Sequence, residues 1–182
     1  MFDHILLSLI KGLTPITLMQ LLEKTQTAKD VINILKSKDA HYIVKNISQI
    51  RNQLTDIELS KKVEQILENC NRNNIRVINS KSSSYPKLLK ECCDRPNILY
   101  MKGNYCINNK PLIAIVGTRN CTEYGLKTCK EIIHEISKYE IGLVSGLAYG
   151  IDSKVHKIAN ELKIPNFAVL GSGLLNIYPK TN

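Results

Sequence analysis

The residues best suited to bind a ligand lie in the segment Val144–Asp152, where a serine and two glycines follow an apolar run. The apolar run Ile141–Val144 leads into it, and apolar residues at helical spacing, beginning with Val155 and Ile158, follow it. This order predicts a strand, a tight turn and a helix. Such a turn places backbone N–H groups and a helix N-terminus at the carboxyl end of a strand, which suits an anionic ligand.

The same layout occurs at Ile113–Arg119 and at Phe167–Gly173. In a parallel sheet the three strand ends would lie on one edge. Arg119, just beyond the first strand, could donate two hydrogen bonds from its guanidinium to a phosphate. An exposed loop arginine without a ligand fits the local sequence equally well. Lys180 could place a charge on the same edge, and taken alone it is equally a mobile lysine near the end of the chain.

Several residues around these turns have a structural and a functional interpretation. Ser145 could hydrogen-bond a ligand oxygen, while Gly146 and the Gly171–Gly173 segment allow close approach of a ligand to the backbone. We expect Asp152 to be a helix N-cap rather than a catalyst, because aspartate is favoured at that position for structural reasons. We expect His156 to be buried and hydrogen-bonded rather than a general base, since no carboxylate partner is evident near it in the sequence.

Common catalytic and nucleotide-binding motifs are absent from the sequence. There is no Gly-x-x-x-x-Gly-Lys-Ser/Thr phosphate loop, and the segment that begins at Gly117 (Gly-Thr-Arg-Asn-Cys-Thr) does not match the dinucleotide fingerprint. Ser145 and Ser172 also lack the Gly-x-Ser-x-Gly frame of a hydrolase nucleophile. The sequence therefore gives no direct support for ATP, NAD or another cofactor.

The composition favours an anionic partner in a reducing compartment. The 182 residues carry a formal charge of +9, which suits nucleic acid, although an AT-rich genome that encodes lysine freely would give the same balance. The six cysteines form no Cys-x-x-Cys pair and have no histidine at zinc-finger spacing, so we expect no metal site. No signal peptide or membrane-spanning run is found, and the cytoplasm is the predicted location.

The N-terminal part of the sequence predicts helices. Apolar residues recur at helical spacing over 2–10 and again from Pro15; Thr27 with Asp30 predicts a capping pair for a third helix, and Thr55 with Glu58 a capping box for a fourth. The break at Gly12–Pro15 resembles a helix-hairpin-helix, which can hold a DNA phosphate on backbone N–H groups. Thr14 stands where a second glycine would be expected, which favours a plain helical packing unit.

The remainder of the chain predicts strands that alternate with helices. Ile75–Ile78 and Ile98–Met101 are short strand-like runs, and Lys81–Ser84 is the best candidate for a linker. From Pro111 onward the apolar runs 112–116, 141–144 and 167–170 are separated by helical patterns. This alternation is typical of right-handed βαβ units and therefore of a parallel sheet in an α/β fold.

A series of motifs from Tyr85 to Asn182 resembles the DNA-processing protein A (Smf) family. The motifs that carry the resemblance are Tyr85-Pro86 with Leu88-Leu89, Asp94-x-Pro96, Leu99-Tyr100-x-Lys102-Gly103, Ile115-Val116-Gly117-Thr118-Arg119, Tyr124-Gly125, the Val144–Asp152 segment with His156, Ala168-Val169-Leu170-Gly171-x-Gly173-Leu174, and Tyr178-Pro179-x-x-Asn182. Their number and order make the resemblance specific, and it covers more than half of the chain.

The resemblance implies a Rossmann-like domain that binds single-stranded DNA, protects incoming DNA during natural transformation and helps load the RecA recombinase. It implies a binding protein rather than an enzyme, with no cofactor. It places Arg119 and Lys180 on backbone phosphates and Gly117, Ser145 and Gly146 on the pocket floor. With the strand-end residues Thr118 and Gly171, these residues form the candidate DNA-binding set.

The chain departs from the family pattern in two ways. Tyr149 replaces a basic residue that usually precedes Gly150, which removes a charge but allows stacking on a base. The chain also stops before further strands, a Ser-Glu-x-Pro segment and an Arg-x-Arg-x-Ile segment. Part of the family's homodimer surface and recombinase contacts lies in that missing half, so a homodimer is expected for the full-length family rather than for this chain.

The expected fold is therefore α/β: a small helical domain over residues 1–80, of helix-hairpin-helix or SAM-like type, precedes a partial extended Rossmann-like domain over 81–182. Its parallel sheet is expected to be incomplete, with the C-terminal half missing. Two alternatives remain for the function. One is a Rossmann-like enzyme that acts on a nucleotide or a phosphoribosyl compound, and the other is an inert truncated product.

Overall fold

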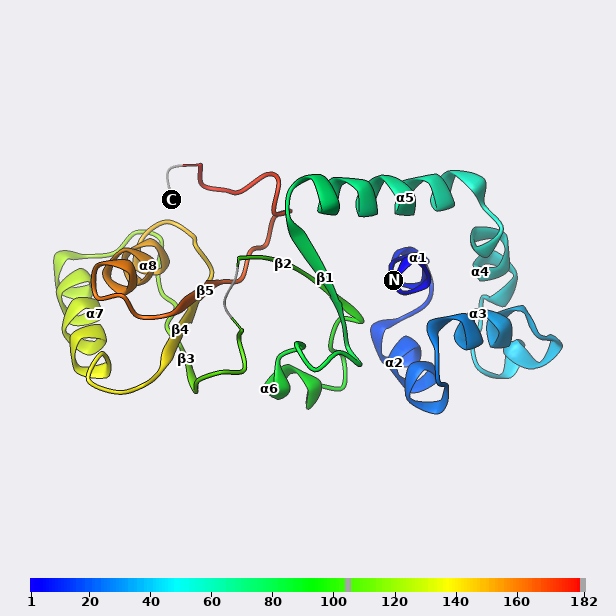
Figure 1. The fold of residues 1–182 in the computed structure, drawn as a ribbon, viewed down its shortest axis with the longest axis horizontal. Coiled ribbons are helices and arrows are strands. Elements are labelled where there is room, and N and C mark those ends of the chain that lie inside the picture. Colours follow the sequence, from blue (N-terminus) through cyan, green and yellow to red (C-terminus); the bar gives the residue numbers. More distant parts are fainter. Residues whose placement is uncertain (104–105, 181–182) are drawn as a thin grey trace. The chain divides into compact units, whose positions relative to one another are not determined.

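The computed structural model describes residues 1–103 and 106–180 and contains two compact units, Met1–Gly103 and 104–182. The first unit contains mainly helices, and the second contains a parallel sheet with two helices (Figure 1). No helix in the described residues is long and apolar enough to cross a membrane.

The helices of the first unit surround one apolar core. They are α1 (Phe2–Leu9), α2 (Pro15–Lys24), α3 (Ala28–Lys36), the 3-10 helix η1 (Lys38–Tyr42), α4 (Ile47–Leu54) and α5 (Ile57–Arg72). Leu22, Val31 and Ile50 are fully buried in this core. The capping pair is confirmed: the Asp30 N–H donates to Thr27 Oγ1 at 3.2 Å, and the Thr27 N–H donates to Asp30 Oδ2 at 2.8 Å.

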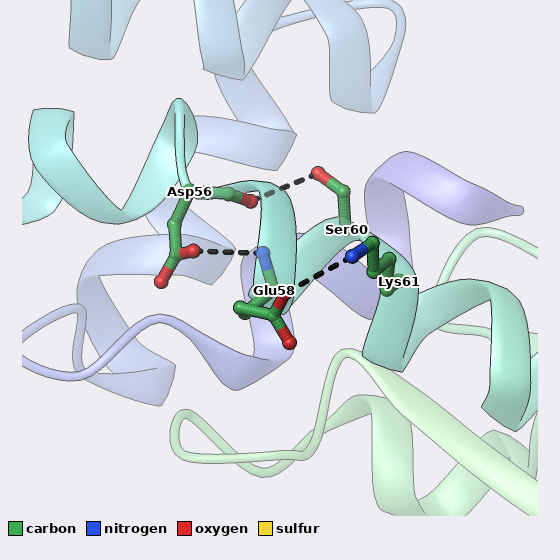
Figure 2. A network of polar contacts seen from close by, with 4 residues as sticks. All are labelled: Asp56, Glu58, Ser60 and Lys61. Atoms are coloured by element: carbon green, nitrogen blue, oxygen red, sulfur yellow. Dashed lines mark hydrogen bonds and ion pairs between the residues drawn. The ribbon is translucent and has the colours of Figure 1, made fainter.

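The predicted capping box at Thr55 and Glu58 is wrong by one residue. The N-cap of α5 is Asp56, whose carboxylate accepts from the Glu58 N–H at 2.8 Å, while Ser60 Oγ donates to the Asp56 carbonyl (Figure 2). Thr55 instead ends α4, because its hydroxyl donates to the Asn52 carbonyl at 3.1 Å. The helix α4 was not predicted from the sequence as a separate element.

The first unit ends in an antiparallel pair of strands that packs on the helices. Strand β1 (Ile75–Asn79) pairs with β2 (Ile98–Lys102), and the short helix α6 (Lys87–Lys90) lies between them in sequence. The reciprocal hydrogen bonds of His4 and Asn97 join α1 to the segment before β2: Asn97 Nδ2 donates to the His4 carbonyl at 3.0 Å, and the two side chains meet at 3.0 Å.

The segment Lys81–Ser84 is part of this first unit and is not a linker between the units. The Lys81 ammonium donates to the carbonyls of Thr25 and Gln26, at 2.6 and 3.1 Å. The compact units divide after Gly103, whereas the sequence placed the domain boundary between residues 80 and 81. The difference arises because β2, which follows the expected boundary, pairs with β1, which precedes it.

The second unit has the predicted α/β arrangement. Strands β3 (Leu112–Ala114), β4 (Gly142–Ser145) and β5 (Asn166–Ala168) form a parallel sheet in the order β3-β4-β5, joined through α7 (Glu123–Ile136) and α8 (Ile151–Glu161). One apolar cluster joins both helices to β4: Ile133 of α7, Leu143 of β4 and Val155 of α8 are completely buried. Both helices therefore pack against the face that carries Leu143, as Figure 1 shows.

The cap of α5 provides a test of the helix boundaries. We expect Asp56→Ala to lower the free energy of unfolding by about 1 kcal/mol, because it removes the acceptor for an otherwise unpaired N–H of the first turn. Thr55→Ala is the control on the neighbouring exposed residue, with an expected loss below about 0.5 kcal/mol. Denaturant melts followed by circular dichroism would measure both losses. A larger loss for Thr55→Ala than for Asp56→Ala would contradict the cap at Asp56 and support the capping box predicted from the sequence.

Candidate functional site

Three strands of the second unit end on the same edge of the sheet. The register pairs Ala114 with Val144 and Ser145 with Ala168, so the turns after β3, β4 and β5 begin side by side. The candidate residues Gly117–Arg119, Ser145, Gly146 and Gly171 all belong to these turns or strand ends. The predicted gathering of the strand ends is confirmed.

A single carboxylate connects two of these turns. Asp152 Oδ1 accepts a hydrogen bond from the Gly117 N–H at 3.3 Å, and Asp152 Oδ2 accepts one from the Gly146 N–H at 3.2 Å. The expectation that Asp152 is the N-cap of α8 is wrong: the N-cap is Gly150, and Asp152 is the second residue of the helix. An acidic side chain in the first turn also interacts favourably with the helix dipole.

Gly150 packs directly against the Arg119 loop. Its φ angle is +80°, and a Cβ added there would lie 2.2 Å from the Thr118 carbonyl oxygen and 2.6 Å from that of Arg119. The Ile151 N–H donates to the same Thr118 carbonyl at 3.2 Å. Only glycine fits this contact, which fixes the turn after β4 against the turn after β3.

The glycines after β5 differ from those after β4. A Cβ added at Gly171 or Gly173 would meet nothing within 4 Å, and neither residue has a positive φ angle. The chain itself therefore does not require glycine here, and the close approach expected from the sequence is not a contact within this unit. By contrast, a Cβ at Gly146 would lie 2.7 Å from Asp152 Oδ2.

Three backbone donors expected to face an anion already have acceptors in the chain. The Gly117 and Gly146 N–H groups bind Asp152, and the Ser153 N–H in the first turn of α8 donates to the Ala148 carbonyl at 3.0 Å. Ser145 is buried, and its hydroxyl has no hydrogen-bond partner among the described residues. An anion at this edge therefore cannot use these three N–H groups unless their present hydrogen bonds break.

His156 lies behind the edge, on the buried side of α8. Its side chain is 6% exposed, and its Nδ1 lies 2.8 Å from Asn166 Oδ1 of β5. Asn166 Nδ2 in turn donates to Asn160 Oδ1 at 2.9 Å. The expected buried, hydrogen-bonded histidine is therefore present, and it ties α8 to β5.

Two cations and two tyrosines are among the exposed side chains of the turns after β3 and β4 and of the segment after β5. Arg119 and Lys180 are both exposed, and neither forms an ion pair with another described residue. The rings of Tyr149 and Tyr178 meet edge to face, with centroids 5.9 Å apart. Both tyrosines stand out in the sequence, but their contact does not, because residues 29 positions apart give no local signal of pairing.

The described residues contain no group of three or more His, Cys, Asp or Glu side chains that could hold a metal ion. All six cysteines are free thiols.

Comparison with known proteins identifies the family. The profile of the DNA recombination-mediator protein A family matches residues 76–182, which is more than half of the chain. The chain belongs to this family. The resemblance that the motifs indicate is thereby confirmed.

Known members of the family are similar over much of the chain. The DNA processing protein DprA of Streptococcus pneumoniae is 35% identical over 71% of this chain, and the protein Smf of Synechocystis is 30% identical over 96% of it. The crystal structure of DNA processing protein A from Streptococcus pneumoniae superposes with a TM-score of 0.72 at 28% identity and covers all of this chain. This similarity supports the predicted Rossmann-like fold.

The alignments cover only part of these relatives. The chain spans 43% of the pneumococcal protein and 45% of the Synechocystis protein, and it covers 62% of the chain in the crystal structure. The activities of these longer proteins are therefore only proposed for this chain.

The packing at Gly150 gives a matched pair of variants. Gly150→Ala should lower the free energy of unfolding by more than about 1 kcal/mol, since the new methyl would overlap two carbonyl oxygens at a positive φ angle. Gly171→Ala should leave it within about 0.5 kcal/mol of wild type, because its Cβ meets open space. Thermal and denaturant melts would measure both; equal effects of the two substitutions would contradict the packing described for the edge.

Proposed function

We propose that this chain binds single-stranded DNA at the carboxyl edge of the β3-β4-β5 sheet. In this proposal it serves DNA processing by protecting incoming strands during natural transformation and by helping to load the RecA recombinase. It acts by binding, without a catalytic step. Membership of the DNA recombination-mediator protein A family and the similarity to the DNA processing protein DprA support the proposal.

The observation that carries the proposal is the position of Arg119. Its guanidinium is exposed and forms no ion pair with a described residue, yet its backbone is held by Gly150. A guanidinium on a fixed loop can donate two parallel hydrogen bonds to one phosphate at little cost in loop ordering. Lys180 supplies a second cation, and the net charge of +9 favours encounter with a polyanion.

The proposal assigns different roles to the candidate residues. Arg119 and Lys180 contact phosphates. The Thr118 hydroxyl donates to the Asn120 carbonyl at 3.3 Å and accepts from the Asn120 N–H at 3.2 Å, so Thr118 shapes the loop that carries Arg119. Because the Gly117 and Gly146 N–H groups already donate to the Asp152 carboxylate, these glycines shape the edge rather than donate to DNA. Buried Ser145 and exposed Gly171 complete the walls of the site.

The cellular setting is also part of the proposal. Six free thiols suit a reducing cytoplasm, where DNA and the recombinase are found. Self-association and contact with RecA are proposed for the complete family proteins, which are more than twice as long as the region aligned with this chain.

Arg119→Ala tests the phosphate contact. We expect affinity for oligo-dT to fall by about 1.5–3 kcal/mol, the usual loss for a charge-assisted hydrogen bond. The magnitude of the negative slope of log K against log salt should decrease by about 0.7 for the lost phosphate contact. Fluorescence anisotropy across a salt series would measure both quantities, with Arg72→Ala as a control that removes the same charge from an exposed site on α5.

Full binding by Arg119→Ala, or binding of the wild type that does not depend on salt, would contradict the proposal. A thermal-shift screen separates it from the enzyme alternative. Oligo-dT should raise the melting temperature of a DNA-binding protein, whereas stabilisation by nucleoside monophosphates alone would favour the enzyme.

A further inference from the structure

Two exposed tyrosines stand together on the proposed DNA edge. Tyr149 is 44% exposed and Tyr178 is 66% exposed, and their ring planes lie at 87° with centroids 5.9 Å apart. This is the geometry in which aromatic rings attract each other, so the contact holds both rings in place. Neither ring belongs to the apolar core of the second unit, so the exposed aromatic surface is not explained by core packing.

The backbone places this pair beside the cations. Tyr149 immediately precedes Gly150, whose backbone contacts the carbonyls of Thr118 and Arg119. Tyr178 comes two residues before Lys180 in the sequence. A strand whose phosphates bind Arg119 and Lys180 would therefore pass close to the two rings.

The edge-to-face arrangement leaves ring faces available. The ring whose edge points at its partner has both faces uncovered by that partner, and the partner keeps its outer face. Nucleic acid bases stack on aromatic faces, and every base can do so regardless of sequence. In a duplex both faces of a base are covered by its neighbours, so only an unpaired base can use such a platform.

We propose that Tyr149 and Tyr178 form a stacking platform for an unpaired base of the bound strand. The proposal rests on the proposed function, and it adds the feature that selects single-stranded over duplex DNA. The cations bind phosphates, which single-stranded and duplex DNA both present, whereas the tyrosine pair stacks on the exposed face of an unpaired base.

The chain provides a matched control. Tyr139 is 71% exposed, but it precedes β4 and therefore lies at the amino end of the strands, on the opposite edge of the sheet. Tyr139→Leu removes the same ring from the same unit without touching the platform. The chain has no tryptophan, so its tyrosine emission can be observed directly.

The experiment compares binding of oligo-dT with binding of an abasic strand of the same length, which keeps the phosphates and lacks the bases. Tyr149→Leu should weaken oligo-dT binding about 5-fold to 150-fold and leave the abasic affinity unchanged. Tyr149→Phe should bind both strands as the wild type does, and Tyr178→Leu should show the same selective loss as Tyr149→Leu. Tyr139→Leu should alter neither affinity, and oligo-dT, but not the abasic strand, should quench the wild-type tyrosine emission.

Three results would overturn the platform. If Tyr149→Leu and Tyr178→Leu both bind oligo-dT with wild-type affinity, the stacking platform is refuted, while the proposed binding of single-stranded DNA is not. Equal losses on the oligo-dT and abasic strands would show that the rings merely support the edge. Failure of the wild type to bind either strand would refute the proposed function itself, and the platform with it.

Discussion

The carboxylate of Asp152 is the interaction on which the candidate edge depends. It accepts from the Gly117 N–H after β3 and from the Gly146 N–H after β4, so one side chain joins two turns that the sheet only brings near each other. Burial of a carboxylate is costly unless its oxygens are hydrogen-bonded, and these two donors offset that cost. Gly150 completes the arrangement, because its missing side chain lets the turn after β4 contact the carbonyls of Thr118 and Arg119.

This internal use of the amides changes the chemistry of the site. A glycine-rich turn at a strand end is typically an anion cradle of backbone N–H groups, but here an aspartate of the chain already occupies two of them. In the proposed function, recognition then depends on Arg119 and Lys180 for phosphates and on the tyrosine pair for bases. Such a surface binds a flexible strand with strong salt dependence and little sequence preference.

Local patterns predicted the elements better than they predicted the contacts between them. The strand, turn and helix around Val144–Asp152 and the Thr27–Asp30 capping box follow from residues close in sequence, and the structure confirms both. The cap of α5 was misplaced because Thr55 and Asp56 are adjacent residues that both cap well. The second partner of Asp152 could not be predicted, because Gly117 lies 35 residues away and only the sheet brings it close.

Amide hydrogen exchange at Gly117 and Gly146, measured by NMR with and without oligo-dT, tests the central claim most directly. If Asp152 holds both N–H groups and side chains bind the DNA, the two amides are protected in the free protein and their exchange changes little when oligo-dT binds. Fast exchange in the free protein, followed by strong protection on binding, would show instead that the backbone donates to the phosphates.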